Sequence, residues 1–384
     1  MNKMIFTYGF ALFGMFFGAG NLVFPLAIGR STSEHWLLGF FGLMITGIVL
    51  PFIGLFALKA NKGNYVDFFG GAGKMAKAAL PLLILSLIGS FGAMPRCITL
   101  VYGSVTNIIP DLPAVIFNFI FCAVTYFVCL SEQRITNLLG KYLAPALLVF
   151  LAILVILGVI NGDHASAGAG ILAGTGTLDG AQSFSHGFKT GYQTMDLLGA
   201  IFFSALIFSQ VQRALPKGVS DSDTVKFAMK IGTIAMVLLA IMYLGMVFLG
   251  ANFSDLITSV EPASIIMVIA QHLMGDYAMW CMSLLVALAC FTTVVALNNT
   301  YAQYLCSLFN CKDNFKFVLL GTTAVAFFVS LFGFGAIAGF LSKILDCLYP
   351  SIVVLAIVSI FSKNMTLKTA LFYGVLAAVL LCGL

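Results

Sequence analysis

The segment FFGAGNLVFP, residues 16–25, places two glycines, an asparagine and a proline inside a long apolar stretch. Glycine loosens a helix, and proline lacks the N–H donor that continues it. In lipid, a broken helix is tolerated only where it lines a protein cavity. Unwinding there would free carbonyls for a cation and a helix N-terminus for a carboxylate. The segment predicts a site for a small zwitterion and a cation. Alternatively, Gly14 and Gly18 form a G-x-x-x-G pattern that simply allows close helix packing.

A second apolar stretch is interrupted in a comparable way near the middle of the chain. The segment GYQTMDLLGA, residues 191–200, carries Gln193, Thr194 and Asp196 just before a continuous apolar run. The two interruptions open two presumed halves of five spans each. Paired glycine-interrupted spans at matching positions are typical of inverted-repeat transporters. Because five is an odd number, the second half would enter the membrane from the opposite side.

Adjacent hydroxyl groups in a third apolar stretch suit an alkali cation. The segment ACFTTVVALNN, residues 289–299, contains Thr292 and Thr293. Hydroxyl oxygens beside freed backbone carbonyls would coordinate sodium. The alternative is that each hydroxyl bonds the carbonyl one turn back, as threonines in membrane helices often do.

Two ionisable residues, Arg96 and Asp196, fall inside or beside predicted spans. An ionisable group at membrane depth is a functional hypothesis by default, because burying its charge is costly. We expect this pair to act in gating or to form a charge pair. Asp196 alone would also serve as a proton site.

The composition requires a bilayer around these segments. The 384 residues are 61% hydrophobic and only 9% charged, with a mean hydropathy of +1.07. A soluble domain of this size cannot bury so much apolar surface. A membrane span needs about 20 apolar residues. Eleven such stretches are predicted, near 5–28, 35–58, 79–108, 113–130, 142–160, 190–211, 226–250, 278–308, 315–333, 338–361 and 366–384.

The positions of the basic residues predict the orientation of these spans. With the N-terminus in the cytoplasm, most of the 19 Lys and Arg fall in inner loops, as the positive-inside rule requires. The net charge of +5 follows from these loops and does not indicate a nucleic acid partner. Two outer segments, 161–189 and 251–276, are candidate lids, and the second is expected to form a helical hairpin.

The motifs of several other protein classes are missing from the sequence. No G-x-x-x-x-G-K-[ST] is present, which argues against direct use of ATP, and no H-E-x-x-H or nucleophile elbow suggests a hydrolase. The four His and nine Cys show no metal-ligand spacing. We therefore expect no enzymatic activity and no cofactor apart from a coupling ion.

Four separated motifs carry a family resemblance. The segments FFGAGNLVFP, GAMPRCITLVYGSV, GYQTMD and ACFTTVVAL resemble those of the branched-chain amino acid:cation symporters, the LIVCS or BrnQ family. The similarity runs from about residue 5 to the C-terminus. It implies the leucine-transporter fold of the amino acid–polyamine–organocation superfamily, an all-α 5+5 inverted repeat with discontinuous helices 1 and 6. Members usually have twelve helices, whereas eleven spans are predicted here.

The resemblance also implies roles for individual residues. In that fold, sodium lies between carbonyls of the first helix and hydroxyls of the eighth, which correspond here to Gly14 and Phe17 and to Thr292 and Thr293. The substrate's carboxylate and amine would meet the backbone of the two breaks. The corresponding residues are Ala19, Gly20, Asn21, Gly191, Tyr192 and Thr194. Position along the chain suggests Phe91, Met94 and Met195 as the lining for an apolar substrate side chain.

These observations favour one transmembrane transporter domain in the cell (inner) membrane. It would comprise a first repeat at 1–160, a second at 190–361 and an extra C-terminal helix at 366–384. The expected function is import of leucine, isoleucine and valine, coupled to sodium by alternating access. The alternatives are proton coupling through Asp196, or a channel or sensor that binds the amino acid without carrying it.

Overall fold

Apolar helices form the whole regular structure of the described part of the chain. The computed structural model describes residues 2–61, 63–130, 144–161, 178–203 and 221–382. The α-helices are α1 (Asn2–Phe16), α2 (Ala19–Thr32), α3 (Trp36–Met44), α4 (Leu50–Ala60), α5 (Tyr65–Gly70), α6 (Lys74–Ile88), α7 (Ala93–Thr106), α8 (Ala114–Cys129), α10 (Ala144–Asn161), α12 (Gly180–Tyr192), α14 (Asp221–Asn252), α15 (Ile265–Met274), α16 (Asp276–Leu308), α17 (Phe315–Ser330), α18 (Phe334–Phe361) and α19 (Met365–Cys382). A further helical segment covers 196–203.

The helices have the length and composition of membrane spans. Within the described ranges, 6 continuous helical stretches are long and apolar enough to cross a bilayer, and shorter apolar helices accompany them. Large side chains such as Phe119, Phe127 and Leu284 are exposed on the outer surface of the helices, where lipid would contact them. The prediction of a helical membrane protein is confirmed. Residues 142–143, 204–211 and 383–384 of the predicted spans lie outside the described residues.

Both predicted interruptions are present, together with two irregularities that were not predicted. The first span is divided between α1 and α2, and the sixth is divided at 193–195. The third predicted span is also broken, because residues 89–92 separate α6 from α7. A π-helical turn at Ile45–Val49 joins α3 to α4. The sixth span begins at Gly180, ten residues earlier than predicted, and the predicted outer segment 251–276 contains α15.

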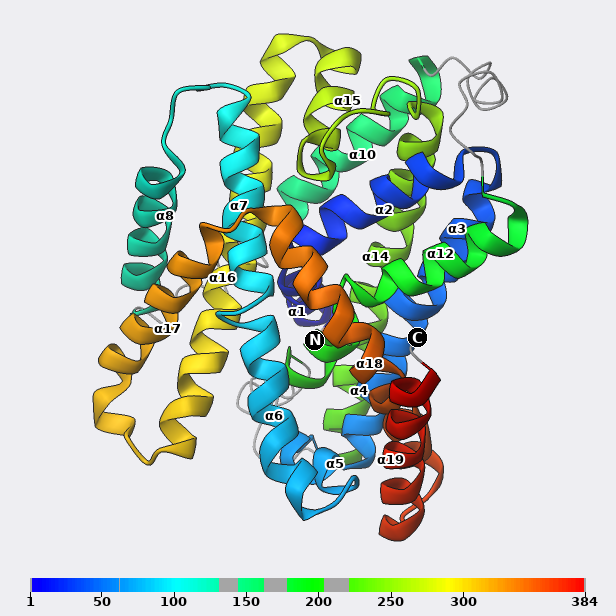
Figure 1. Ribbon diagram of the computed structural model, residues 1–384, viewed down its shortest axis with the longest axis vertical. Coiled ribbons are helices and arrows are strands. Elements are labelled where there is room, and N and C mark those ends of the chain that lie inside the picture. The colour runs from blue at the N-terminus through cyan, green and yellow to red at the C-terminus, as the bar shows by residue number, and fades with distance from the viewer. Residues whose placement is uncertain (1, 62, 131–143, 162–177, 204–220, 383–384) are drawn as a thin grey trace.

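Two pairs of helices approach each other closely through glycine. A Cβ built on Gly29 of α2 would lie 2.0 Å from the Val247 carbonyl oxygen of α14, and one built on Gly42 of α3 would lie 2.2 Å from the Phe184 carbonyl oxygen of α12. No larger side chain fits at either position without backbone movement. These contacts join α2 to α14 and α3 to α12 in the part of the molecule that surrounds the two breaks (Figure 1).

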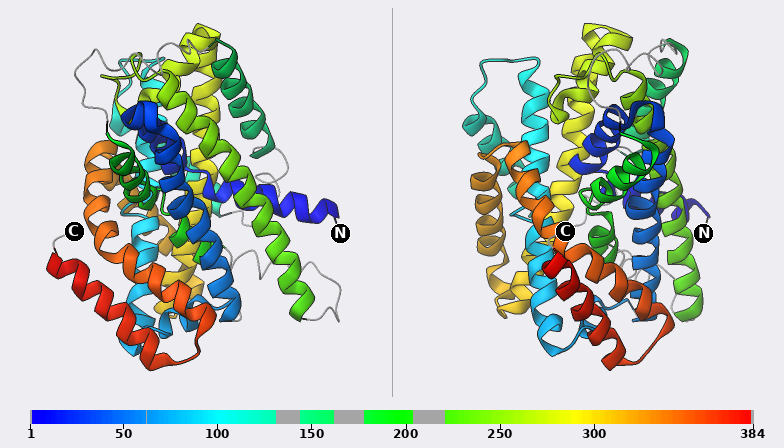
Figure 2. Two further views of the ribbon diagram at one scale, coloured as in Figure 1. Left: turned by 90° about the vertical axis from the view of Figure 1, so that its right-hand side faces the viewer. Right: turned by 45° about the vertical axis from the view of Figure 1, so that its right-hand side comes forward.

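The remaining helices surround this group. Helices α8 and α17 lie beside each other on one flank, and α16 passes between that flank and the breaks (Figure 1). Helix α1 runs across the direction of the long α14 (Figure 2, left). The interrupted ends of α1, α2 and α12 consequently meet in the interior of the molecule.

Candidate functional site

The first break leaves backbone groups without their usual helical partners. Helix α1 ends at Phe16, and the Gly18 N–H turns back to the Phe16 carbonyl at 2.8 Å. The Asn21 side chain also accepts from the Gly18 N–H, at 3.2 Å. Among the described residues, no backbone N–H donates to the Gly14 or Phe17 carbonyl. Two carbonyls named in the sodium prediction are therefore free of backbone hydrogen bonds.

Pro25 does not cause this break, contrary to the sequence prediction. It lies inside α2, and its side chain is buried. Its missing N–H leaves the Asn21 carbonyl, four residues earlier, without a helical donor. The interruption itself is confined to Phe17 and Gly18.

The second break is a short turn with one unusual backbone conformation. Met195 has φ +58°, which is uncommon for a residue other than glycine. Within the turn, the Thr194 hydroxyl donates to the Gly191 carbonyl at 2.8 Å. Where the helix resumes, the Leu197 N–H donates to the Tyr349 hydroxyl at 3.1 Å. Such strained conformations concentrate at functional sites.

The two breaks are in direct contact. A Cβ built on Gly20 would lie 3.2 Å from the Thr194 Cα and 3.3 Å from the Gln193 carbonyl oxygen. Only glycine lets the start of α2 approach the second break so closely without displacing it. The halves of the chain therefore meet at the two points where their first helices are interrupted.

A buried hydrogen-bond network connects the two breaks. The Asn21 Nδ2 donates to the Asp196 carboxylate oxygens at 2.8 and 3.0 Å. The Tyr243 hydroxyl donates to the same carboxylate at 2.5 Å and is itself hydrogen bonded to the Asn21 amide. Asp196 is only 2% exposed, yet its hydrogen-bond partners among the described residues are all uncharged. A cation or a proton would compensate this carboxylate, because an unpaired buried charge is costly.

Arg96 contacts the second break but does not pair with Asp196. Both its Nη atoms donate to the Gln193 carbonyl at 3.0 Å, and its guanidinium lies 5.4 Å from the centre of the Phe24 ring. The Nε of this buried side chain has no hydrogen-bond partner among the residues that the structure describes. The carbonyl at the end of α12 carries the negative end of the helix dipole and holds the guanidinium there. The charge-pair alternative is therefore wrong, since the ion pair found among the described residues is Lys77–Asp67, whereas a gating role for Arg96 and Asp196 stays a prediction.

Thr293 lies directly beside the first break. A Cβ built on Gly18 would lie 3.2 Å from the Thr293 Oγ1. Both threonine hydroxyls donate to the Ala289 carbonyl, Thr292 at 2.7 Å and Thr293 at 3.2 Å. A hydroxyl that donates to a carbonyl retains lone pairs for a cation. The hydrogen bond to the carbonyl one turn back is therefore compatible with the predicted role of these hydroxyls in ion binding.

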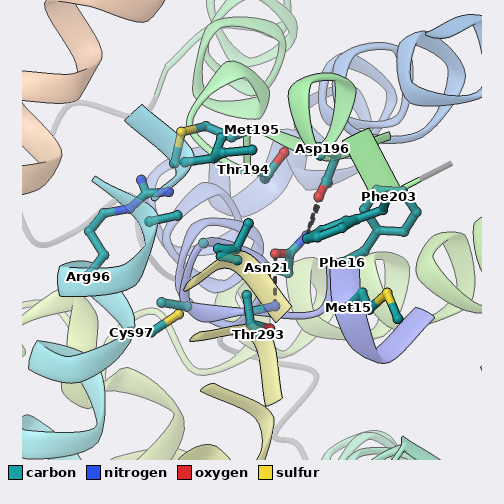
Figure 3. A pocket seen from close by; sticks show the side chains of 17 residues that line it. Met15, Phe16, Asn21, Arg96, Cys97, Thr194, Met195, Asp196, Phe203 and Thr293 are labelled. Atoms are coloured by element: carbon teal, nitrogen blue, oxygen red, sulfur yellow. Dashed lines mark hydrogen bonds between the residues drawn. The ribbon is translucent and has the colours of Figure 1, made fainter. Parts of the chain in front are cut away.

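A small cavity of about 40 Å³ lies between the breaks, α7 and α16, and it is smaller than the sites that usually hold a small molecule. Figure 3 shows Asp196, Asn21 and Thr293 along one part of it and the Arg96 guanidinium beyond Thr194. Its lining consists of Met15, Phe16, Gly18, Ala19, Gly20, Asn21, Ile88, Ala93, Arg96, Cys97, Thr194, Met195, Asp196, Gly199, Phe203, Thr293 and Leu297. It thus combines one acid, one base and a largely apolar wall.

Several predicted site residues do not line this cavity. Phe91 lies in the unpredicted break of the third span and is 44% exposed, and Met94 is buried elsewhere in the core. The cause is that α7 restarts at Ala93, so that Ala93, Arg96 and Cys97 share the face turned to the cavity. Gly14, Phe17, Gly191, Tyr192 and Thr292 also lie outside the cavity lining. Tyr192 instead stacks on Tyr349, with ring centres 4.5 Å apart.

Other contributors were missed from the sequence. Tyr243 donates to Asp196, and Phe203 forms an apolar wall, edge-on to Phe16 with ring centres 5.8 Å apart. Tyr243 lies inside the predicted span 226–250 and could have been proposed from the sequence as a partner of Asp196, because a buried aspartate requires hydrogen-bond donors. Phe203 carries no such signal in a chain with 37 Phe.

Comparison with known proteins identifies relatives along the whole chain. A family model described as "Branched-chain amino acid transport protein" matches residues 1–384. The branched-chain amino acid permease BraB of Bacillus subtilis (strain 168) is 29% identical over 362 residues, which cover 92% of this chain and 79% of that protein. The branched-chain amino acid permease BrnQ of Corynebacterium glutamicum is 28% identical over 390 residues, covering 98% and 86%.

Solved structures share the fold at low sequence identity. The nucleobase-cation-symport-1 family transporter Mhp1, closed with bromovinylhydantoin bound, matches with a TM-score of 0.64 and 16% identity, over 98% of this chain and 90% of that one. MhsT in complex with L-phenylalanine matches with a TM-score of 0.60 and 16% identity, over 97% of both chains. The predicted leucine-transporter-type fold is confirmed.

Proposed function

Because the chain belongs to the branched-chain amino acid transport protein family, we propose that it carries leucine, isoleucine and valine across the cell membrane as a secondary active symporter. The observation that carries this proposal is the cavity between the two helix breaks, where an acid, a base and an apolar wall converge. Family membership also confirms the expectation that the protein is not an enzyme. The named relatives are permeases of branched-chain amino acids.

The charge pattern of the cavity matches a zwitterion. The substrate ammonium would lie toward Asp196, whose buried carboxylate has only uncharged partners. The substrate carboxylate would lie toward the N-terminus of α2 at Ala19 and Gly20, where the helix dipole is positive. Arg96 would add positive charge on that side. Each end of the amino acid would thus meet a group of opposite sign.

The apolar wall would receive the branched side chain. Met15, Phe16, Ile88, Met195, Phe203 and Leu297 provide it. Such a wall gives little discrimination among leucine, isoleucine and valine, because one methylene is worth only about 1–3 kcal/mol. We therefore expect all three to compete for one site.

Sodium would bind between α1 and α16. The free carbonyls of Gly14 and Phe17 and the hydroxyls of Thr292 and Thr293 supply uncharged oxygen ligands. Sodium is favoured as the coupling ion because these oxygens carry no formal charge and the Thr293 hydroxyl lies beside the first break. Ion and substrate would be coupled by favouring the same conformations.

Alternating access would move the breaks together with their neighbours. The glycine contacts that join α2 to α14 and α3 to α12 would let these helices move as one unit against the others. The cytoplasmic N-terminus is part of this proposal and rests on the lysine distribution.

Proton coupling is the second candidate, and the environment of Asp196 favours it specifically. A proton on this carboxylate would remove an unpaired buried charge while Asn21 and Tyr243 keep it in position. Protonation would then replace sodium binding as the event that accompanies substrate entry.

Counterflow tests transport itself. Proteoliposomes preloaded with unlabelled leucine are diluted into labelled leucine without an ion gradient, and protein-free liposomes serve as the control. A carrier accumulates label transiently, and external isoleucine or valine suppresses this accumulation. Binding without accumulation would instead favour a sensor, and non-saturating flux would favour a channel.

A further inference from the structure

A second cavity lies far from the helix breaks, at the end of the molecule where α5, α6, α18 and α19 meet (the lower end in Figure 1). Its volume is about 550 Å³. Its charged lining consists of Asp67, Lys74, Lys77, Lys363 and Lys368. We call this cavity the basic groove. Nothing in the proposed transport cycle uses it.

The groove is held together by a contact between distant parts of the sequence. The Thr369 hydroxyl of α19 donates to the Gly71 carbonyl, in the turn between α5 and α6, at 3.1 Å. The side chain of Lys368 packs over the same turn, since a Cβ built on Gly71 would lie 3.0 Å from its Cδ. The two walls of the groove are therefore fixed relative to each other.

The positive charge of the groove exceeds its negative charge. Asp67 is its one lining acid and lies 3.4 Å from Lys77, in an exposed pair. The side chains of Lys74, Lys363 and Lys368 have no hydrogen bond or ion pair with any described residue. Like charges gathered in one concave surface repel each other unless an anion joins them.

Lys368 is the least exposed of these lysines. The residue is only 7% exposed, so its aliphatic chain is packed away while its ammonium faces the groove without an acceptor among the described residues. A positive charge held in a concave surface without a partner attracts an anion. Ser359, another lining residue, also has a buried hydroxyl without a hydrogen-bond partner in the described part of the chain.

The backbone adds to the positive potential. Helix α6 begins at Lys74, and no side chain caps its N-terminus. The first N–H groups of a helix lack intrahelical acceptors and carry the positive end of the helix dipole. Helix α19 also begins at the groove, with Lys368 in its first turn, but there the Asn364 side chain already accepts from the Thr366 and Leu367 N–H groups. Lysines are unfavourable at this end of a helix, but a phosphate is favoured there.

From these observations we propose that the basic groove binds a phosphate-bearing anion. Lys368 and Lys74 would contact the phosphate oxygens, and the N-terminus of α6 would face them. In the cytoplasmic N-terminus orientation the groove lies at the inner membrane surface. Anionic phospholipid headgroups are attracted to basic pockets there. A phospholipid headgroup and a free phosphate share the required chemistry, and the test separates them.

The test uses the full-length protein in detergent, with thermal unfolding as the readout. Phosphatidylglycerol, phosphatidylcholine and inorganic phosphate are titrated separately. Lys368→Met and Lys74→Met remove one groove charge each. Lys316→Met is the matched control, because Lys316 is an exposed lysine of α17 outside the groove.

Phosphatidylglycerol should raise the unfolding temperature of the wild type and of Lys316→Met by several degrees, and phosphatidylcholine should not. Lys368→Met and Lys74→Met should each lose at least half of that shift. A response to phosphatidylglycerol alone identifies a headgroup site, and a similar response to millimolar phosphate identifies a free-phosphate site. Equal responses in all four proteins, or to both lipids, would overturn the proposal.

A second measurement tests the groove without Lys368→Met, in case that variant folds poorly. Native mass spectrometry counts the phosphatidylglycerol molecules retained by the wild type, Lys74→Met and Lys316→Met. At least fivefold lower retention by Lys74→Met alone supports the groove. Equal retention in the three proteins overturns it.

Discussion

The Asn21 side-chain amide donates to both carboxylate oxygens of Asp196, at 2.8 and 3.0 Å, although 175 positions separate the two residues along the chain. Asn21 belongs to the first turn of α2, and Asp196 starts the helical segment that follows the second break. This contact ties the two interrupted helices to each other. A ligand that attracts the Asp196 carboxylate therefore acts on both breaks at once.

Neutralising Asp196 should weaken substrate binding. Asp196→Asn keeps the size of the side chain but removes the charge that would face the ammonium group. Hydrogen bonds to charged groups contribute about 1.5–3 kcal/mol, so leucine affinity should fall roughly 10-fold to 150-fold. Equilibrium binding of labelled leucine measures this. The control Asp255→Asn, at an exposed aspartate, should bind normally. Unchanged affinity in Asp196→Asn would remove Asp196 from the substrate site.

Removing the Thr293 hydroxyl should impair sodium dependence. Thr293→Val keeps the side-chain shape against Gly18 but loses one oxygen ligand, so the sodium concentration for half-maximal uptake should rise about tenfold or more. Thr300→Val is the control, because Thr300 also donates to a carbonyl one turn back on α16, at 2.8 Å. Its sodium dependence should change less than about twofold. The same small effect in both variants would contradict the proposed sodium site.

The wall formed by Phe203 should limit substrate size. Phe203→Ala would enlarge the cavity, lowering leucine uptake and admitting phenylalanine. Apolar contacts of this kind change specificity by about 1–3 kcal/mol per methylene, so the ratio of leucine to phenylalanine uptake should fall at least tenfold. Phe332→Ala, at a side chain that is 75% exposed, should leave the ratio unchanged. An unchanged ratio in Phe203→Ala would place the substrate elsewhere.

Added volume between α2 and α14 should destabilise the protein. In Gly29→Ala the new methyl group would meet the Val247 carbonyl oxygen, and overpacking typically costs about 1–3 kcal/mol. Gly321→Ala is the matched control, because nothing lies within 4 Å of a Cβ built there. It should be neutral or more stable by up to about 1 kcal/mol. The unfolding temperatures of the two variants are measured with a thiol-reactive dye, which labels the buried cysteines as the protein unfolds. Equal unfolding temperatures would contradict the close packing of these helices.

The sequence was informative about which segments depart from regular helix, and less so about where side chains point. Glycine and polar residues interrupt otherwise apolar stretches at Gly18–Asn21 and at Gln193–Asp196. Such residues favour a break in the helix, and a break leaves backbone groups that lipid cannot pair, so both breaks were predictable beside a protein cavity. The break at 89–92 was not predicted, because Gly89 and Gly92 also suit close packing. That break resets the helical phase, which is why Met94 was wrongly placed in the cavity and Ala93 and Cys97 were missed.

Long-range partners were the hardest part to predict. A buried aspartate requires donors, but nothing in the local pattern around Asp196 selects Tyr243 rather than another hydroxyl. Likewise, a charge pair between Arg96 and Asp196 was one expectation from the sequence, whereas in the structure Arg96 donates to the Gln193 carbonyl. Burial and helix ends decide between such partners, and both depend on the assembled fold.

The central claim is that this cavity carries branched-chain amino acids with a coupling cation. Its most direct test is uptake of labelled leucine into proteoliposomes, first under an inward sodium gradient and then under a proton gradient alone. We expect sodium-driven accumulation above equilibrium that excess isoleucine blocks and that Asp196→Asn abolishes. Accumulation with protons alone would contradict sodium coupling. Sodium-driven uptake that Asp196→Asn leaves intact would contradict the proposed site.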